Sequence, residues 1–185
     1  MAAPRRSSVR SLQRLRDNGR PITVLTAYDA TFARLFEEAG ADALLVGDSL
    51  GNVVQGHSTT LPVTLDHIIY HTAAVVRATT AVHVIADMPF GTYGVDEATS
   101  VHNAVRVMQE SGASAVKLEG GGSMAPLVRR MVDIGIPVMG HLGFTPQSVH
   151  RFGGHYVQGR GDAADTLVDD ARALEAAGAY AVVLE

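Results

Sequence analysis

The sequence predicts an α/β protein built as a (β/α)8 TIM barrel, of which about six strands are present. Three observations carry this prediction: a recurring Gly-Ala-x-Ala motif after helical stretches, an apolar run after each motif, and polar residues where the apolar runs end. Continuous apolar runs, as opposed to alternating ones, are typical of strands covered on both faces in a parallel sheet. The alternation of helices and strands then implies right-handed crossovers.

The repeated motif marks the junction between a helix and the strand that follows it. It occurs at residues 40–46, 112–116 and 178–184. A glycine just past a helix tolerates the left-handed conformation in which many helices end. Each copy therefore predicts a helix that stops at the glycine and a buried strand directly afterwards.

Six strands with intervening helices are expected along the chain. The strands are expected at residues 22–27, 43–47, 82–86, 114–118, 136–140 and 180–184. The helices are expected at residues 30–39, 64–78, 96–111, 123–134 and 162–177. Side chains able to accept hydrogen bonds from the first free N–H groups are the expected caps: Thr64, Asp96, Ser123 and Asp162.

An open, doubly wound sheet is the competing architecture. A dinucleotide-binding version would carry a glycine-rich phosphate motif after the first strand, whereas residues 26–29 read Thr-Ala-Tyr-Asp. A barrel typically needs eight strands and about 250 residues. A barrel that is incomplete at the C-terminus is therefore the favoured interpretation.

The chain is predicted to be a single domain over residues 1–185, with an N-terminal helical extension at residues 1–20. Six arginines lie in this extension, which has no apolar core and so is not a secretory signal. The favoured interpretation is a short amphipathic helix capped by Ser7 or Ser8. A transit peptide is the alternative.

The composition excludes several classes of function. The formal net charge of -4 provides no basic surface for nucleic acid or for an anionic membrane. The absence of cysteine excludes disulfides, thiolate zinc sites and cysteine nucleophiles. No apolar run approaches the roughly 20 residues needed to cross a bilayer, so no membrane is expected. The net charge likewise gives no reason to expect a nucleic-acid partner.

Polar side chains at the ends of successive predicted strands are the candidate site residues. They are Asp48, Ser49, Asp87, Lys117, Glu119, His141 and Glu185. The C-terminal ends of barrel strands converge on one rim, where catalytic residues of this fold lie. The alternative is that strand ends are polar simply because they meet solvent.

Three of these residues, Asp48, Asp87 and Glu119, form an all-oxygen set that suits a hard cation such as Mg²⁺. Zinc would prefer His or Cys ligands, and only His141 is available at this rim. A bound Mg²⁺ would chelate a 2-oxo acid and, as a Lewis acid, would stabilise the enolate formed when the neighbouring carbon loses a proton.

Lys117 and Glu185 have several open interpretations. Lys117 is the only lysine, beside fourteen arginines. It could pair with the oxo acid, form a Schiff base with it, or neutralise a rim carboxylate such as Glu119. Glu185 follows an apolar run and could act as a general base, or it could be a solvated residue at the end of the chain.

Two weaker candidates lie elsewhere. His67 and His71 have the spacing of a helical zinc pair but lack the base glutamate of a metalloprotease, so helix packing or a hydrogen bond to a loop is favoured. The run at residues 120–123, Gly-Gly-Gly-Ser, could bind an anion through backbone N–H groups or could be a flexible loop.

Ordered motifs along the chain support a more specific interpretation. They lie at residues 26–29, 46–51, 55–57, 60–64, 70–75, 86–90, 116–120, 140–143, 145–148, 153–154, 157–161 and 183–185. At these motifs the sequence resembles the ketopantoate hydroxymethyltransferase (3-methyl-2-oxobutanoate hydroxymethyltransferase) family. The resemblance covers essentially the whole chain from about residue 8.

The resemblance implies a magnesium-dependent barrel enzyme of pantothenate and coenzyme A biosynthesis. Such an enzyme moves a hydroxymethyl group from 5,10-methylenetetrahydrofolate to 3-methyl-2-oxobutanoate and gives 2-dehydropantoate. It also implies a cytoplasmic homo-oligomer, a decamer in the family, whose partners are the small 2-oxo acid and the folate.

The resemblance further implies a role for each rim residue. The magnesium ligands would be Asp48, Asp87 and Glu119, the last through water. The residues that touch the 2-oxo acid would be Asp48, Ser49, Asp87 and Lys117. Glu185 would accept the proton from the branched carbon, and His141 would lie near the substrate.

The family continues past the position of residue 185 with two more barrel strands. A sheet without them should expose two apolar strand edges, so the isolated 185 residues are expected to be poorly soluble or inactive. The alternatives are a related magnesium-dependent 2-oxo acid lyase, a Schiff-base aldolase, and a non-catalytic truncated barrel.

Overall fold

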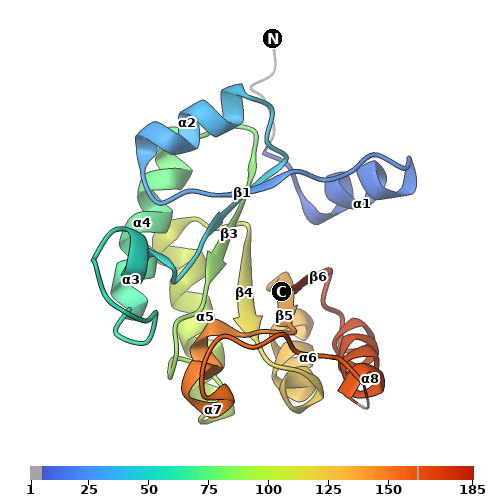
Figure 1. The fold of residues 1–185 in the computed structure, drawn as a ribbon. Helices are drawn as coiled ribbons and strands as arrows, with labels where there is room; N and C mark the ends of the chain where they lie inside the picture. The colour runs from blue at the N-terminus through green and yellow to red at the C-terminus, as the bar shows by residue number, and fades with distance from the viewer. Residues whose placement is uncertain (1–5, 162) are drawn as a thin grey trace.

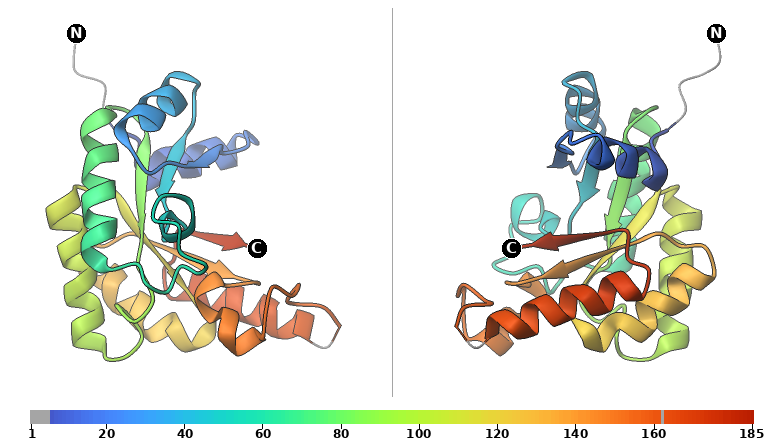
Figure 2. Two further views of the ribbon diagram at one scale, coloured as in Figure 1. Left: turned by 60° about the vertical axis from the view of Figure 1, so that its left-hand side comes forward. Right: turned by 90° about the vertical axis from the view of Figure 1, so that its right-hand side faces the viewer.

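Within the residues that the structure describes, the sheet consists of six parallel strands whose order in space is their order in the sequence (Figure 1). The computed structural model describes residues 6–161 and 163–185. The strands are β1 Val24–Thr26, β2 Ala43–Val46, β3 His83–Asp87, β4 Ala115–Glu119, β5 Val138–Leu142 and β6 Ala181–Leu184. The sheet curls into part of a barrel, which confirms the predicted fold class (Figure 2).

Helices connect each strand to the next. They are α2 Ala30–Glu38, α3 Leu50–Val53, α4 Leu65–Ala78, α5 Glu97–Ser111, α6 Ala125–Asp133, α7 Val149–Phe152 and α8 Ala163–Ala176, with 3-10 turns at Gly122–Met124 and Pro146–Ser148. Helix α1, Val9–Asp17, precedes the first strand. In the part of the chain that the structure describes, no helix has the length and apolar character needed to cross a membrane.

Two of the expected helix caps are confirmed. The Thr64 hydroxyl accepts a hydrogen bond from the His67 N–H at 3.2 Å, and the Asp96 carboxylate accepts one from the Ala98 N–H at 3.0 Å. Asp29, which was not predicted, caps α2 in the same way, accepting from the Thr31 N–H at 2.7 Å. The expected cap Asp162 lies outside the described residues.

Ser123 was wrongly predicted as a cap. It lies inside the 3-10 turn Gly122–Met124, and α6 begins at Ala125 without a hydrogen bond from a capping side chain. A proline follows at the start of α6. Because proline has no N–H and its φ is already helical, this helix start needs less capping than most.

Strand β5 begins two residues later than predicted. Gly135 ends α6 with a positive φ of 94°, and the Ile136 N–H still bonds back to the helical carbonyl of Met131 at 3.0 Å. The next residue, Pro137, has no N–H to give to a sheet. The strand also ends two residues later than predicted, at Leu142, so His141 lies inside β5, directly beside Glu119 of β4 in the sheet register.

The main core lies between the sheet and its outer helices. Its largest fully buried side chains include Leu118, Met131 and Leu174. Gly140 of β5 allows α8 to approach closely, because a Cβ there would lie 2.8 Å from the Leu174 side chain. The outer layer therefore holds the strands at fixed spacing along one face of the sheet.

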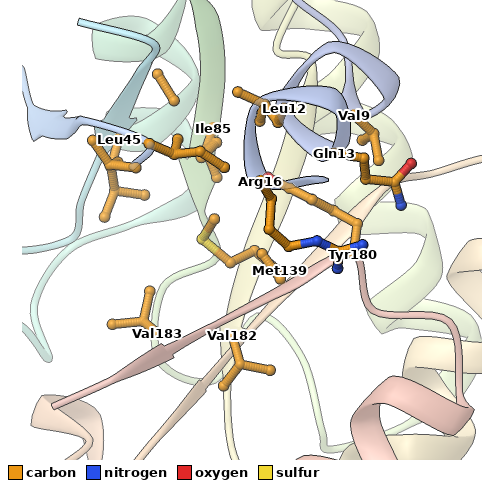
Figure 3. Close-up of a pocket in the computed structure, with 14 residues that line it drawn as sticks. Val9, Leu12, Gln13, Arg16, Leu45, Ile85, Met139, Tyr180, Val182 and Val183 are labelled. Atoms are coloured by element: carbon orange, nitrogen blue, oxygen red, sulfur yellow. The ribbon is translucent and has the colours of Figure 1, made fainter. Parts of the chain in front are cut away.

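The inner face of the sheet carries a smaller cluster of apolar side chains, Ala43, Ile85, Ala115 and Met139. Helix α1 lies over this face and, with Leu12, helps to line a largely apolar cavity of about 360 Å³ (Figure 3). The helix is capped by Ser8. The inner face is thus apolar along the strands, and the polar residues expected for the site lie at the C-terminal ends of the same strands.

Strands β1 and β6 are the two edges of the sheet within the described residues. Both carry exposed apolar side chains: Val24 and Leu25 on β1, and Val182 and Leu184 on β6. This observation agrees with the expectation of two apolar strand edges. Exposed edges of this kind are ready to pair with further chain.

Glu37, at the end of α2, fixes the turn that leads into β3. Its carboxylate accepts hydrogen bonds from the backbone N–H groups of Thr80 at 3.0 Å, Ala81 at 2.7 Å and Val82 at 2.8 Å. Partial burial alone would raise the pKa of Glu37, but these bonds and the charge of Arg6 outweigh burial and lower it.

We predict that Glu37→Gln destabilises the fold by about 1 kcal/mol at pH 7, since the neutral amide accepts weaker hydrogen bonds. A carboxylate with a lowered folded-state pKa stabilises the fold above its unfolded pKa, and this stabilisation is lost as the pH falls through the folded value. The difference between the two proteins in urea unfolding should therefore shrink below about pH 4. Glu38→Gln, at the exposed neighbour, is the control and should show little loss.

Candidate active site

Five of the expected site residues converge at the C-terminal ends of the strands. Asp48, Asp87, Lys117, Glu119 and His141 are all buried there, each with less than a tenth of its surface exposed. Burial of this many ionisable groups is unusual unless they are paired or bind a ligand. Their grouping therefore favours a functional site over the alternative of solvated strand ends.

The period-two geometry of strands explains why these side chains meet. Successive side chains alternate between faces, so residues two apart share a face. Lys117 and Glu119 follow Ala115 on the inner face, and Asp87 follows Ile85. The register pairs Asp87 directly with Lys117. The polar side chains of the rim thus lie on the same face of the sheet as the apolar cluster, nearer the C-terminal ends of the strands.

Lys117 lies among the rim carboxylates. Its Nζ donates to both oxygens of Asp87, at 2.7 and 2.8 Å, and lies 3.6 Å from Oε1 of Glu119. Asp48 is tied to the same group, because its backbone N–H donates to Oδ2 of Asp87 at 3.2 Å. The ammonium group therefore compensates acidic charge that is buried on three strands.

This arrangement sets the protonation of Lys117. Burial alone would lower the pKa of Lys117, but the charges of Asp87, Glu119 and Asp48 outweigh burial and raise it. The amine therefore stays protonated at neutral pH. A Schiff base needs the neutral amine as nucleophile, so the structure favours an ion-pairing role and argues against the Schiff-base interpretation.

In Asp48, the effect of burial on the pKa is not outweighed by the neighbouring charges, in contrast to Lys117. Burial raises the pKa of Asp48 to about 7, and the neighbouring Asp87 adds to this effect, while Lys117 and a hydrogen bond from Gln147 oppose it. A carboxyl group that titrates near neutrality inside a rim of charged groups is typical of functional sites. A cation bound beside it would favour the ionised form.

His141 lies between two glutamates. Its Nδ1 is 3.4 Å from Oε1 of Glu119, and its Nε2 is 3.3 Å from Oε2 of Glu185. Within the described residues, both ring nitrogens and Oε1 of Glu119 are buried without a hydrogen-bond partner. Buried polar atoms normally have partners, so these three atoms are the ones available to a bound ligand.

Glu185 is held by the loop after β5. Its N–H donates to the Leu142 carbonyl at 3.1 Å, and its carbonyl accepts from the Phe144 N–H at 2.8 Å. Gly143 between them has a positive φ of 84°, and a Cβ there would collide with the Glu185 carbonyl. The side chain of Glu185 is 52% exposed and points to the rim through its contact with His141.

Ser49 lies at the near edge of the rim. Its hydroxyl is 2.9 Å from the hydroxyl of Tyr28, and it precedes α3. The sequence marked Tyr28 only as part of a motif and assigned it no role. The pair places two hydroxyl groups beside Asp48, where they can contact a polar ligand.

Sequence reasoning missed Gln147 and Tyr93. The Gln147 side-chain amide donates to Oδ2 of Asp48 at 2.8 Å, and its carbonyl accepts from the Tyr93 hydroxyl at 2.7 Å. Gln147 lies in one of the motifs that carry the family resemblance, which is the only sequence signal that includes it. No rule of spacing or periodicity singles out a loop glutamine.

The two weaker candidates have structural roles. His67 Nδ1 accepts from the Thr64 N–H at 3.2 Å, and His71 Nδ1 lies 2.7 Å from the Tyr28 carbonyl, so the favoured hydrogen-bond interpretation is confirmed. The glycine run does hold an anion, but that anion is the protein's own Asp170 carboxylate, which accepts from the Gly122 N–H at 2.7 Å.

The structure does not group the three expected metal ligands into a closed set. Across residues 6–161 and 163–185, no three His, Asp or Glu side chains lie together so that they could hold a metal ion. The physical reason is that the ammonium of Lys117 takes both oxygens of Asp87 and approaches Glu119. Asp48 and Asp87 remain as neighbouring carboxylates, which fits Mg²⁺, since this ion binds one or two carboxylates and keeps several waters.

Comparison with known proteins identifies the family of this chain. A sequence profile described as "Ketopantoate hydroxymethyltransferase" matches residues 6–185. The chain belongs to the ketopantoate hydroxymethyltransferase family. The resemblance seen in the sequence is thereby confirmed.

Two relatives in the ketopantoate hydroxymethyltransferase family show how far the similarity extends. The 3-methyl-2-oxobutanoate hydroxymethyltransferase of Anaeromyxobacter sp. (strain Fw109-5) is 53% identical over 100% of this chain and 62% of its own length. The protein of the same name from Ralstonia nicotianae (strain ATCC BAA-1114 / GMI1000) is 59% identical over 96% of this chain and 65% of its own length. The chain thus spans less than two thirds of the length of these relatives.

Solved structures show the same fold. A crystal structure of phosphonopyruvate hydrolase in complex with oxalate and Mg²⁺ superposes with a TM-score of 0.73, covering 97% of this chain and 63% of that chain. The two sequences are only 15% identical. The similarity therefore supports the barrel architecture and nothing finer.

We predict that Lys117→Met destabilises the fold by about 3 kcal/mol or more, because it leaves buried carboxylates without a counter-charge. The double variant Lys117→Met/Asp87→Asn should recover part of the loss, since it also removes the charge that lost its partner. Urea unfolding in the presence of a chelator measures both effects. A single variant as stable as the unmodified protein would show that the ion pair contributes no net stability.

We predict that Gly143→Ala displaces Glu185 from His141, since the new Cβ would overlap the Glu185 carbonyl. Gly135→Ala is the matched control, because Gly135 also has a positive φ but a Cβ there would meet nothing within 4 Å. Both variants should lose about 1 kcal/mol from the left-handed backbone. Only Gly143→Ala should shift the NMR signals of the His141 ring, and equal shifts in both would contradict the prediction.

Proposed function

We propose that this protein transfers a hydroxymethyl group from 5,10-methylenetetrahydrofolate to 3-methyl-2-oxobutanoate, giving 2-dehydropantoate. Family membership supports this activity, as do relatives named 3-methyl-2-oxobutanoate hydroxymethyltransferase. The observation that carries the proposal is the convergence of Asp48, Asp87, Lys117 and Glu185 on one rim. These groups match what the reaction needs: a cationic site for an oxo acid and a base beside it.

The 2-oxo acid carries a carboxylate and a neighbouring keto oxygen, and both need positive or donor groups. The Lys117 ammonium is the cation at the centre of the rim, and it stays charged for the reason given above. The hydroxyls of Ser49 and Tyr28 are donors at the edge. In the proposed complex, Asp48, Ser49, Asp87 and Lys117 line the site of the oxo acid.

In the proposed complex, the side chains of Asp48 and Asp87 would hold a magnesium ion at this rim, and Glu119 would contribute through water. An oxygen-only donor set and the unpartnered Oε1 of Glu119 support this assignment. Phosphonopyruvate hydrolase, which shares the fold, has been crystallised with oxalate and Mg²⁺. When bound, the ion supplies a Lewis acid that stabilises negative charge on the keto oxygen.

Glu185 is the proposed proton acceptor. It would take the proton from C3 of the oxo acid, and the electron pair of that C–H bond would move into the enolate. Water adds to the methylene carbon of the folate, both C–N bonds of that carbon break, and tetrahydrofolate and formaldehyde result. C3 of the enolate then bonds to the formaldehyde carbon, and the formaldehyde oxygen takes the proton from Glu185, which gives 2-dehydropantoate. His141 lies between the proposed base and Glu119, with Nε2 3.3 Å from Glu185 and Nδ1 3.4 Å from Glu119.

The proposal places the protein in pantothenate and coenzyme A biosynthesis, in the cytoplasm, as a homo-oligomer. A decamer is the expected form, because that is the state that the family resemblance implies.

The first half of the reaction can be tested without the folate. We predict that the chain, completed with the two further barrel strands that the family resemblance implies and supplied with Mg²⁺, exchanges the C3 proton of 3-methyl-2-oxobutanoate with D₂O, as followed by proton NMR. Glu185→Gln should slow this exchange at least about 100-fold, because the amide cannot accept the proton. Glu175→Gln, at an exposed position on α8, is the control and should leave the rate unchanged.

The full reaction is tested by adding 5,10-methylenetetrahydrofolate and detecting 2-dehydropantoate by mass spectrometry. Removal of metal with a chelator should stop both exchange and product formation, and added Mg²⁺ should restore them. Cleavage of the oxo acid in place of hydroxymethyl transfer would indicate a lyase. Absence of both exchange and product would indicate a chain that does not carry the activity by itself.

A further inference from the structure

We infer that Gln147 is a positioning residue that fixes Asp48 and Glu119 on the rim. The inference deepens the proposed function and, for its effect on rate, rests on it. Gln147 follows β5 in the 3-10 turn Pro146–Ser148 and is buried although it belongs to a loop. Its contacts reach the ends of three other strands.

Every polar group of the Gln147 side chain is engaged. Its Nε2 donates to Oδ2 of Asp48 at 2.8 Å and to the Met88 carbonyl at 2.9 Å. Its Oε1 accepts from the Tyr93 hydroxyl at 2.7 Å. These partners determine the orientation of the amide, because a rotation by half a turn would place Oε1 against two acceptors.

The backbone of Gln147 fixes the second carboxylate. Its N–H donates to Oε2 of Glu119 at 3.0 Å, which leaves Oε1 of Glu119 as the oxygen without a partner. Tyr93 closes the network, since its hydroxyl oxygen accepts from the Glu119 N–H at 3.0 Å. Gln147 thus binds one oxygen of each carboxylate, Oδ2 of Asp48 and Oε2 of Glu119.

The same loop also touches the proposed proton acceptor. The Phe144 N–H donates to the Glu185 carbonyl, and the Ser148 N–H closes the turn onto the Thr145 carbonyl at 2.8 Å. Residues 143–148 therefore run from Glu185 at one side of the rim to Asp48 at the other. A rigid turn of this kind can set the separation between the base and the acidic pair.

Loss of the Gln147 amide should leave Asp48 free to turn toward Lys117. Groups that orient ligating carboxylates typically change metal affinity or activity by about 10- to 100-fold when they are removed. Gln147→Met keeps the length of the side chain and removes both polar ends. Gln147→Glu keeps the acceptor for Tyr93 but places a carboxylate oxygen against Asp48.

The positioning role is tested first without any substrate. In ¹⁵N NMR spectra, the Gln147 side-chain NH₂ signals should exchange slowly with water and should shift in Asp48→Asn and in Tyr93→Phe. Gln109→Met, at an exposed position on α5, should leave them unchanged. Gln147 signals that exchange rapidly and respond to neither substitution would overturn the inference.

The effect on rate is tested by C3 proton exchange with Mg²⁺ present. Gln147→Met should lower kcat for exchange about 10-fold and weaken Mg²⁺ binding in calorimetry, and Gln147→Glu should lower kcat at least as much. If Gln147 only fills space, both variants should stay within about twofold of the unmodified protein, and this result would overturn the inference. Failure of the proposed function would instead show as no exchange in the unmodified protein, and the NMR arm would then decide the positioning role alone.

Discussion

The rim depends on one interaction, the contact of the Lys117 ammonium with the carboxylates at the ends of β3 and β4. An isolated charge in this position would be strongly unfavourable, because burial removes its solvation. The pairing of Asp87 with Lys117 in the sheet register brings the two charges together. Everything else at the rim is arranged around this pair: Asp48 bonds to it through its backbone, and Glu119 borders it.

The two faces of the sheet have different roles: the outer face packs in the main core, and the inner face carries the polar rim. Outer helices bury a large apolar core, and close packing there allows little movement of the strands. The inner face is apolar at its floor and becomes polar only at the strand ends. Side chains at the ends of well-packed strands are held in fixed positions, and precise orientation of a small ligand requires such fixed positions.

Much of this could be read from the sequence, and the reasons are local. Continuous apolar runs and glycine stops are properties of a few adjacent residues, so the six strands and the caps Thr64 and Asp96 were predicted. Rim residues such as Asp87 were found because strand ends of a parallel sheet must converge. The start of β5 was wrong by two residues, because the turn at Gly135 competes with an apolar pattern that continues through it.

What the sequence could not provide were contacts between distant segments. Gln147 and Asp48 lie 99 residues apart, and no pattern near either residue indicates that they touch. The hydrogen bond from the glycine run to Asp170 is another such contact. The sequence of a glycine loop is the same whether the loop binds a ligand or a side chain of the protein. The contacts of Lys117 could not be read from the sequence for a related reason: the position of a lysine between Asp87 and Glu119 depends on the three-dimensional packing of several strands.

Helix α1 lies over the interior of the sheet away from the rim, next to the cavity on the inner face, whereas Glu185 lies on the rim itself. The two ends of the inner face are therefore unequal as places to attach a label. A fluorophore or surface tether on the solvent side of α1 would hold the molecule without crowding the polar strand ends. The same group on a side chain at the rim would crowd Lys117 and its carboxylates, so immobilisation and labelling chemistry should approach this protein from the side of α1.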